Sequence, residues 1–263
     1  MTSGPPSGAQ KLNNDVDWDV DFDPKEYIRH NYLVLHRDDK EIISAVRNHF
    51  SDHFRRHSGR VRSGIDVGAG PNLYPAFTML PWCDSITLLE RSSRNVAYLE
   101  SQRDGYDGNW DQFWNVLSED DEYARFGEDP RARFREAVEV RPGNLFDLGV
   151  EGPDGTVERW SMGTMFFVAE SITTSLEEFR HGVRRFMDAL EPGAPFAAAF
   201  MEHSLGYAVG RHEFPARDVG EQEVRNLLKE YAGDVDPVHI GEPGGLVREG
   251  YTGMILACGH RND

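Results

Sequence analysis

The sequence predicts an α/β protein built around a parallel sheet. Strand-like and helix-like segments alternate along most of the chain, an order typical of parallel sheets. Segment 162–169 is a nearly continuous apolar run, as expected for a strand covered on both faces. A glycine turn, Gly68-Ala69-Gly70, directly follows a short apolar strand, where such sheets open their ligand crevice. At 263 residues the chain suits one sizeable domain.

The first part of the chain is predicted to hold a tail, three helices and two strands. Residues 1–14 are rich in Gly, Pro, Ser and Asn and lack the basic start and apolar centre of a signal peptide, so we expect disorder over 1–20. Asp38 and Glu41 are spaced as a capping box, and apolar residues then recur three or four apart, which predicts a helix reaching residue 54. Strands are predicted at 65–67 and 86–90, with a helix after Pro71 and another over about 93–102.

The middle of the chain interrupts this alternation. Residues 103–142 are irregular and predict a decoration on the sheet domain, in which Trp110, Phe113 and Trp114 form a small satellite core. A third strand is predicted at 138–140. Beyond the buried strand at 162–169, Ser175 and Glu178 form a second capping-box pair before a helix that stops at 191–193. A strand at 196–201, a helix over about 220–231 and strands near 237–240 and 251–257 complete the series.

The composition excludes several classes of partner. A formal charge of −17 repels nucleic acid and anionic lipid surfaces, and the apolar runs are shorter than the ~20 residues that span a bilayer. Cys83 and Cys258 form neither a disulfide framework nor a zinc motif, which fits a cytoplasmic location. His49, His53 and His57 recur every four residues, but no carboxylate or cysteine completes a ligand set. They are predicted to lie beside the apolar stripe of an amphipathic helix, and no metal is expected.

The glycine turn carries the chemistry of a nucleoside site. The pattern is D-x-G-x-G-P from Asp66, and it lacks the third glycine of the dinucleotide fingerprint. An acid before the glycines suits a ligand with a positively charged amino-acid end, such as S-adenosylmethionine. Glu90 ends the next strand about 20 residues later, where nucleoside sites place the acid that holds ribose hydroxyls.

Two segments together resemble one enzyme family. The pattern F-x-P-x-x-Y-x-x-x-x-Y runs from Phe22 to Tyr32, and in the second segment a proline follows Gly70 and Tyr74 comes four residues after that glycine. This combination resembles the family of small-molecule amine methyltransferases that includes nicotinamide, phenylethanolamine and indolethylamine N-methyltransferases. The likeness spans roughly 21–257 and weakens toward the C-terminus.

The resemblance implies a Rossmann-like class I methyltransferase fold. That fold has a mixed seven-stranded sheet with helices on both faces and an antiparallel last strand. The resemblance also implies a single domain over 21–263, with an N-terminal lid segment at 21–37 and an insertion at 103–142. A monomer is the implied oligomeric state.

The resemblance further implies a cofactor, S-adenosylmethionine, with S-adenosylhomocysteine as its product. Glu90 would bind the ribose in place of the family's usual aspartate, and Asn144 stands where an aspartate usually meets the adenine; an asparagine oxygen can accept the same hydrogen bond. The cofactor-binding residues so implied are Tyr32, Asp66, Gly68, Ala69, Gly70, Tyr74, Glu90, Asn95, Asn144, Leu145 and Thr164.

On the acceptor side the resemblance implies fewer residues. Tyr27 would close over the acceptor as part of the lid and exclude water from a charged sulfonium, and Met165 would line the pocket. Glu202 would orient an amine or remove its proton, with His203 and Tyr207 as further candidates. The predicted catalytic residues are Glu202, Tyr27 and His203, and the predicted substrate-binding residues are Tyr27, Met165, Glu202 and Tyr207.

The predicted function is therefore methyl transfer from S-adenosylmethionine to a small amine or N-heterocycle by in-line displacement. Two alternatives remain open at this point. The fold does not determine the accepting atom, so an O- or C-methyltransferase of a specialised metabolite is one, and a cofactor-binding interaction module without catalysis is the other.

Overall fold

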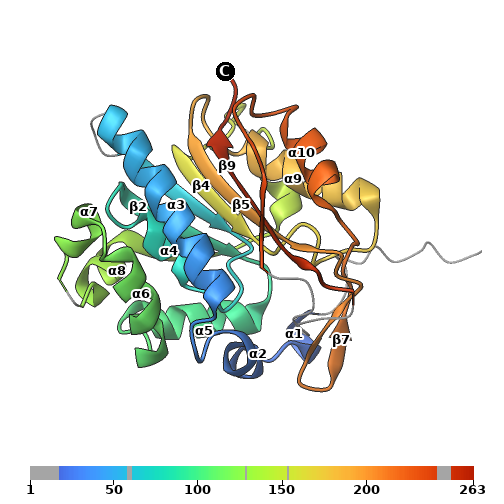
Figure 1. Cartoon of the computed structure of the whole chain (residues 1–263), viewed down its shortest axis with the longest axis horizontal. Helices are drawn as coiled ribbons and strands as arrows, with labels where there is room; N and C mark the ends of the chain where they lie inside the picture. The colour runs from blue at the N-terminus through green and yellow to red at the C-terminus, as the bar shows by residue number, and fades with distance from the viewer. Residues whose placement is uncertain (1–17, 58–60, 128, 153, 242–249) are drawn as a thin grey trace, which may run out of the picture.

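The computed structural model describes residues 18–57, 61–127, 129–152, 154–241 and 250–263 (Figure 1). Its main sheet has seven strands in the order β3-β2-β1-β4-β5-β9-β8. The strands are β1 (Val61–Val67), β2 (Cys83–Glu90), β3 (Val138–Pro142), β4 (Met162–Phe166), β5 (Pro195–Glu202), β8 (Val238–Ile240) and β9 (Gly253–His260). Neighbours from β3 to β5 pair in parallel, whereas β9 is antiparallel to both β5 and β8. The predicted mixed sheet with an antiparallel last strand is confirmed.

Helices cover both faces of this sheet (Figure 1). The helices before the crossover to β4 are α3 (Arg37–Arg56), α4 (Tyr74–Met79), α5 (Ser93–Arg103), α6 (Asp111–Leu117), α7 (Asp121–Ala124) and α8 (Arg131–Ala137), and those after it are α9 (Leu176–Asp188) and α10 (Glu221–Leu228). Successive residues of β5 face opposite cores, as the pleat requires: Ala197 and Ala199 pack with α3 and α4, and Ala198 and Phe200 with α9 and α10. None of the helices in the described part of the chain has both the length and the apolar character that a bilayer crossing needs.

Several predicted boundaries are wrong. Residues 1–17 of the predicted tail lie outside the described residues, but Trp18–Asp21 forms helix α1. The buried strand ends at Phe166 and not at residue 169. Helix α3 begins after His36, which makes no side-chain cap, so Asp38 does not head a capping box. At α9 only half of the box forms: Ser175 Oγ accepts from the Glu178 amide at 3.4 Å, while both Glu178 carboxylate oxygens lack a partner.

The segment predicted as an insertion is firmly joined to the domain. It contains a 3-10 turn, η2 (Gly108–Trp110), and helices α6 to α8, and its last five residues form the edge strand β3. Trp110, Phe113 and Trp114 are fully buried. They belong to the main core beside α3 and α4, which corrects the prediction of a separate satellite core.

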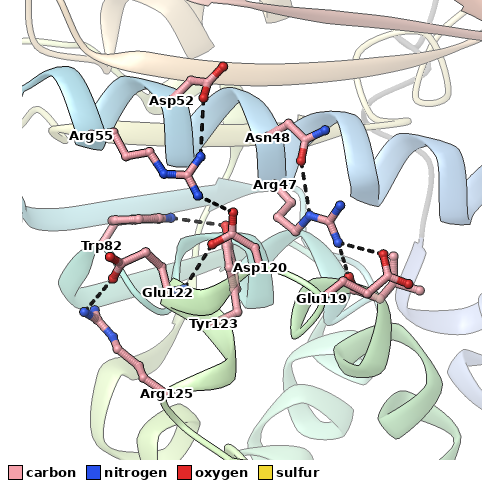
Figure 2. Close-up of polar contacts among 11 residues, drawn as sticks. Arg47, Asn48, Asp52, Arg55, Trp82, Glu119, Asp120, Glu122, Tyr123 and Arg125 are labelled. Atoms are coloured by element: carbon pink, nitrogen blue, oxygen red, sulfur yellow. Dashed lines mark hydrogen bonds and ion pairs between the residues drawn. The ribbon is translucent and has the colours of Figure 1, made fainter.

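Polar contacts also tie this segment to α3 (Figure 2). Arg47 binds Glu119 at 3.0 Å and the carbonyl of Val116, and Arg55 binds Asp120 at 2.7 Å. Beneath them, Tyr123 donates to the Thr78 carbonyl at 2.7 Å and accepts from Trp82 at 3.1 Å.

Two N-terminal helices and a β-hairpin complete the fold. Helices α1 (Trp18–Asp21) and α2 (Pro24–Asn31) lie at the same end of the molecule as a hairpin of β6 (Tyr207–Val209) and β7 (His212–Phe214) (Figure 1). The hairpin was not predicted. Phe22, Val209 and Phe214 form a small core between them, to which Trp18, Tyr27 and Tyr207 add partly buried rings.

Candidate functional site

A pocket opens at the carboxyl ends of β1, β2 and β4. Strands β1 and β4 are neighbours in the sheet although β2 and β3 separate them in sequence, which makes this the position where the strand order reverses and where α/β proteins bind ligands. The pocket encloses about 820 Å³, part of it open to solvent. Its floor consists of the loops after these strands, and its roof comes from α1, α2 and the β6–β7 hairpin.

The glycine turn forms one side of this floor, with Gly68, Ala69 and Gly70 all lining the pocket. Gly68 and Gly70 have φ of 65° and 56°, a region that favours glycine. A Cβ at Gly68 would lie 2.5 Å from Val168, whereas a Cβ at Gly70 would meet nothing closer than 3.9 Å. The turn therefore packs tightly against the loop after β4 and leaves open space beside Gly70.

Glu90 lies at the end of β2, 7% exposed, and its carboxylate is held by backbone amides. Oε2 accepts from the Gly70 amide and Oε1 from the Ser92 amide, both at 2.7 Å. Burial raises the pKa of Glu90, while the Ser92 and Gly70 amides act against that rise. A carboxylate oxygen can accept two hydrogen bonds. Oε1 also accepts from the Asn95 amide, so Oε2 is the oxygen that keeps a lone pair for a ligand.

Three other predicted cofactor residues line the same pocket: Asn95, Asn144 and Leu145. The amide of Asn95 donates to Glu90 at 3.5 Å, and its buried Oδ1 has no hydrogen-bond partner. Asn144 caps the turn η3 (Leu145–Asp147), because its Oδ1 accepts from the Phe146 amide at 3.1 Å. Capping orients the Asn144 side chain at the pocket wall.

Asp66 and Thr164 lie together behind the glycine turn and do not line the pocket. Thr164 donates to Asp66 Oδ1 at 2.7 Å, across the pair of strands β1 and β4. Asp66 Oδ2 is buried without a partner. Burial raises the pKa of Asp66 to about 8, and the nearby charge of Glu90 adds to this, although the Thr164 hydroxyl opposes it.

The predicted tyrosines divide between the pocket and the core. Tyr27 and Tyr32, from α2 and its C-terminal end, line the pocket. Tyr74 is fully buried behind Tyr32, with ring centroids 5.8 Å apart. Its hydroxyl donates to the buried Asp39 at 3.2 Å, so its contacts are inside the protein.

Aromatic rings from distant parts of the chain form the roof. Trp18 stacks on Phe214 at 5.0 Å, and Tyr207 stacks on the same ring at 5.4 Å. Phe22 packs against Tyr27 at 5.2 Å. Trp18, Phe22, Tyr27 and Tyr207 all line the pocket, so the predicted acceptor residues Tyr27 and Tyr207 lie together.

The other predicted acceptor residues lie outside the pocket lining. Met165 is fully buried on the core face that carries α9 and α10. Glu202 accepts from Thr252 at 2.6 Å and lies 3.2 Å from His239, and His203 pairs with Asp218 at 2.7 Å. The predicted base roles of Glu202 and His203 stay predictions, and in this structure both side chains are engaged elsewhere.

Sequence reasoning missed the end of β4 and the loop after it, which supply Phe166, Phe167 and Val168 to the pocket. The strand was predicted to continue to residue 169, and Thr164 and Met165 were assigned to the site from the resemblance. It ends instead at Phe166, and Phe167 has φ of 60°. Positive φ at a non-glycine residue stores strain that is common at functional sites. An apolar sequence without glycine contains no signal for this turn.

The histidines of α3 pair with one another and with the last strand. His53 Nδ1 lies 2.9 Å from His260 Nε2, and His57 Nδ1 lies 3.0 Å from the His53 carbonyl. Burial, with His260 nearby, lowers the pKa of both His49 and His53 to about 4. Among the residues that the structure describes, no three His, Cys, Asp or Glu side chains are grouped to hold a metal ion.

Comparisons with known proteins agree with this architecture. The model of the NNMT/PNMT/TEMT family matches residues 10–243, and a search of the curated protein sequences found no match. A solved S-adenosylmethionine-dependent methyltransferase from Clostridium acetobutylicum ATCC 824 superposes with a TM-score of 0.51 at 9% identity, over 82% of this chain and 91% of the other. N-methyltransferase NodS from Bradyrhizobium japonicum WM9, solved with S-adenosyl-L-homocysteine, gives 0.49 at 14% identity, over 86% and 88%. At such identities the Clostridium structure shows only a shared fold, that of class I methyltransferases.

Proposed function

The chain belongs to the NNMT/PNMT/TEMT family, and on that premise we propose that this S-adenosylmethionine-dependent methyltransferase methylates a nitrogen atom of a small amine or N-heterocycle. The observation that carries the proposal is a single pocket in which the glycine turn and Glu90 lie below a roof of aromatic rings. One half of the pocket has the polar groups that a nucleoside needs, and the other half has flat apolar surfaces.

The polar half fits the adenosyl part of the cofactor. Glu90 Oε2 has acceptor capacity left for one ribose hydroxyl, and the unpartnered Oδ1 of the neighbouring Asn95 can accept from the other. Asn144 and Leu145 would flank the adenine at the end of β3. The open space beside Gly70 permits close approach of a ligand to the backbone. Tyr32 would receive the carboxylate of the amino-acid end.

The aromatic half fits a planar acceptor. Trp18, Phe22 and Tyr207 present rings to the pocket, and aromatic faces bind other flat rings and exclude water. When bound, S-adenosylmethionine supplies a methyl group that is already activated by a positively charged sulfur. The protein's main contribution is then to hold the acceptor nitrogen in line with the sulfur–methyl bond.

Water exclusion is the second contribution of the roof. A nitrogen acceptor must be neutral to attack, and a dry apolar enclosure disfavours its protonated form because a buried cation is poorly solvated. A protein base is therefore dispensable for an N-heterocycle. For a more basic amine, Glu202→Gln would reveal a base role as a loss of turnover on the acid side of the pH profile.

The test combines cofactor binding with product analysis. Calorimetric titration with S-adenosylhomocysteine is expected to show one site, and Glu90→Gln is expected to raise its dissociation constant at least ~10-fold, because one charge-assisted acceptor is lost. Glu100→Gln, on the outer face of α5, is the matched control and is expected to bind like the wild type.

Mass analysis after incubation with S-adenosylmethionine and a mixed pool of amines and N-heterocycles then identifies the accepting atom. A product methylated at oxygen or carbon would overturn the assignment to nitrogen. Binding of the cofactor without any methylated product would favour the interaction module.

A further inference from the structure

A chain of buried polar groups extends from the pocket into the core. Asn72 lines the pocket; its amide donates to the Tyr32 hydroxyl at 3.2 Å, and its Oδ1 accepts from the Tyr74 backbone amide at 3.2 Å. The Tyr74 hydroxyl in turn donates to Asp39 Oδ1 at 3.2 Å. Tyr27 packs on Tyr32 with ring centroids 5.8 Å apart. Asp39, on α3, is the inner end of the chain and is only 4% exposed.

The surroundings of Asp39 disfavour its charged form. Burial raises the pKa of Asp39 to about 7, and the neighbouring Asp38 raises it further, while the Tyr74 hydroxyl acts in the opposite direction. Burial also raises the pKa of both Tyr32 and Tyr74 well above 10, so these phenols are neutral at physiological pH.

Within the described part of the chain, the interactions of Asp39 are with Tyr74 and Asp38 and include no cation. Helix α6 contributes the ring of Phe113, stacked on Tyr74 at 5.5 Å. The chain just after β8 approaches Asp38, because a Cβ at Gly241 would lie 3.0 Å from its carboxylate. His239, on β8, is paired with Glu202 at 3.2 Å.

The proton on Asp39 sets both the direction of its hydrogen bond with Tyr74 and the charge behind the pocket. A charged Asp39 is an acceptor only and holds the Tyr74 hydroxyl proton. A protonated Asp39 can donate to the Tyr74 oxygen instead. In both states the Tyr32 hydroxyl, which accepts from Asn72, can donate into the pocket, but only the protonated state avoids a second negative charge behind an incoming carboxylate.

We propose that Asp39 is a positioning residue that takes up a proton from solvent when the carboxylate of the cofactor's amino-acid end binds at Tyr32. The proposal rests on the proposed function, because it needs a ligand of that chemistry in the pocket. The balance is one proton gained by the protein for each ligand bound.

The effect on affinity follows from linkage. If the ligand binds only the protonated form, the affinity for S-adenosylhomocysteine falls about 10-fold between about pH 6 and pH 8. At about pH 8, where most of Asp39 is charged before binding, each binding event takes up close to one proton. Asp39→Asn cannot take up this proton and is expected to bind with little change across the same range.

The experiment is calorimetric titration with S-adenosylhomocysteine at about pH 8 in phosphate and in Tris, whose ionisation enthalpies differ. The dependence of the observed enthalpy on the buffer counts the protons taken up. The wild type is expected to take up about one proton more than Asp39→Asn. This difference isolates Asp39, because titration of the ligand's own amino group is common to both proteins.

Two further variants sharpen the test. Asp38→Asn, the adjacent and more exposed acid, is expected to keep the proton uptake. Tyr74→Phe is expected to reduce it, since loss of the hydroxyl raises the pKa of Asp39 and leaves it partly protonated beforehand. Equal proton uptake by the wild type and Asp39→Asn would overturn the proposal while cofactor binding stands. Absence of binding by the folded wild type would overturn the proposed function as well.

Discussion

Replacing Asp66 by asparagine is expected to remove part of the pH dependence of folding stability. Asp66 is 1% exposed, and only one of its two oxygens has a hydrogen-bond partner, the Thr164 hydroxyl at 2.7 Å. Burial raises its pKa from the ordinary 3.8 to about 8. The folded protein therefore binds this proton more tightly than the unfolded chain does.

The magnitude follows from the two pKa values. The contribution of the Asp66 proton to stability is complete below about pH 4 and is lost as the pH rises to about 8. At about 1.4 kcal/mol per pH unit, the full loss is on the order of 6 kcal/mol. Asparagine has no proton to lose and keeps an oxygen for the Thr164 hydroxyl, so Asp66→Asn lacks this slope.

The assay is urea unfolding of both proteins between about pH 5 and pH 8. Over this interval the wild type is expected to lose about 3–4 kcal/mol more of its free energy of unfolding than Asp66→Asn does. Asp104→Asn, at the exposed end of α5, is the control and is expected to follow the wild type. Parallel curves for the wild type and Asp66→Asn would refute the reasoning, because they would mean that Asp66 is not held in its neutral form.

Three other predictions, two of them with a control substitution, test the packing of the site and of the inserted segment. Gly68→Ala and Gly193→Ala both place alanine at positive φ, at 65° and 74°, which costs about 1 kcal/mol each. Only at Gly68 would the new Cβ collide with a neighbour, Val168 at 2.5 Å. Thermal unfolding should therefore show that Gly68→Ala loses about 1–3 kcal/mol more of its free energy of unfolding than Gly193→Ala. Equal losses in the two variants would contradict this prediction. Arg47→Gln is expected to lower the free energy of unfolding by about 1–3 kcal/mol, because the 12% exposed Arg47 side chain binds a backbone carbonyl and a carboxylate. Arg55→Gln is its control. The Arg55 side chain is 54% exposed, so urea unfolding should show a loss of less than about 1 kcal/mol. Phe214→Ala removes the ring on which Trp18 and Tyr207 stack and is expected to raise KM for the acceptor roughly 3–10-fold. The dissociation constant of S-adenosylhomocysteine should change less than about 2-fold. A loss confined to cofactor binding would place the acceptor elsewhere.

The residues of the polar pocket floor could be predicted from the sequence because they lie directly at predicted strand ends. Gly68 follows β1 and Glu90 ends β2, and both are where the pattern placed them. The carboxyl ends of parallel strands share one edge of the sheet, so position along the chain was enough to bring these residues together. Asn144 and Leu145 follow β3 for the same reason.

The sequence did not predict which side chains reach the pocket and which are buried behind it. Tyr74 and Thr164 were both predicted to bind the cofactor, yet one bonds to Asp39 and the other to Asp66, inside the protein. Which side chain reaches the pocket depends on where β4 ends and on which buried partner each hydroxyl finds. Neither a strand end at Phe166 nor a positive φ at Phe167 leaves a pattern in an apolar run.

What the sequence by itself determined is therefore the alternation of the main sheet's strands with helices, the glycine turn, the position of Glu90 at the end of β2, and the family. These depend on local periodicity and on short motifs, which neighbouring residues encode. The aromatic roof was decided only by the tertiary structure, because Trp18 and Phe214 meet across about three quarters of the length of the chain. Contacts at that separation arise from how the layers pack, and the packing of the N-terminal helices against the β6–β7 hairpin has no local signal.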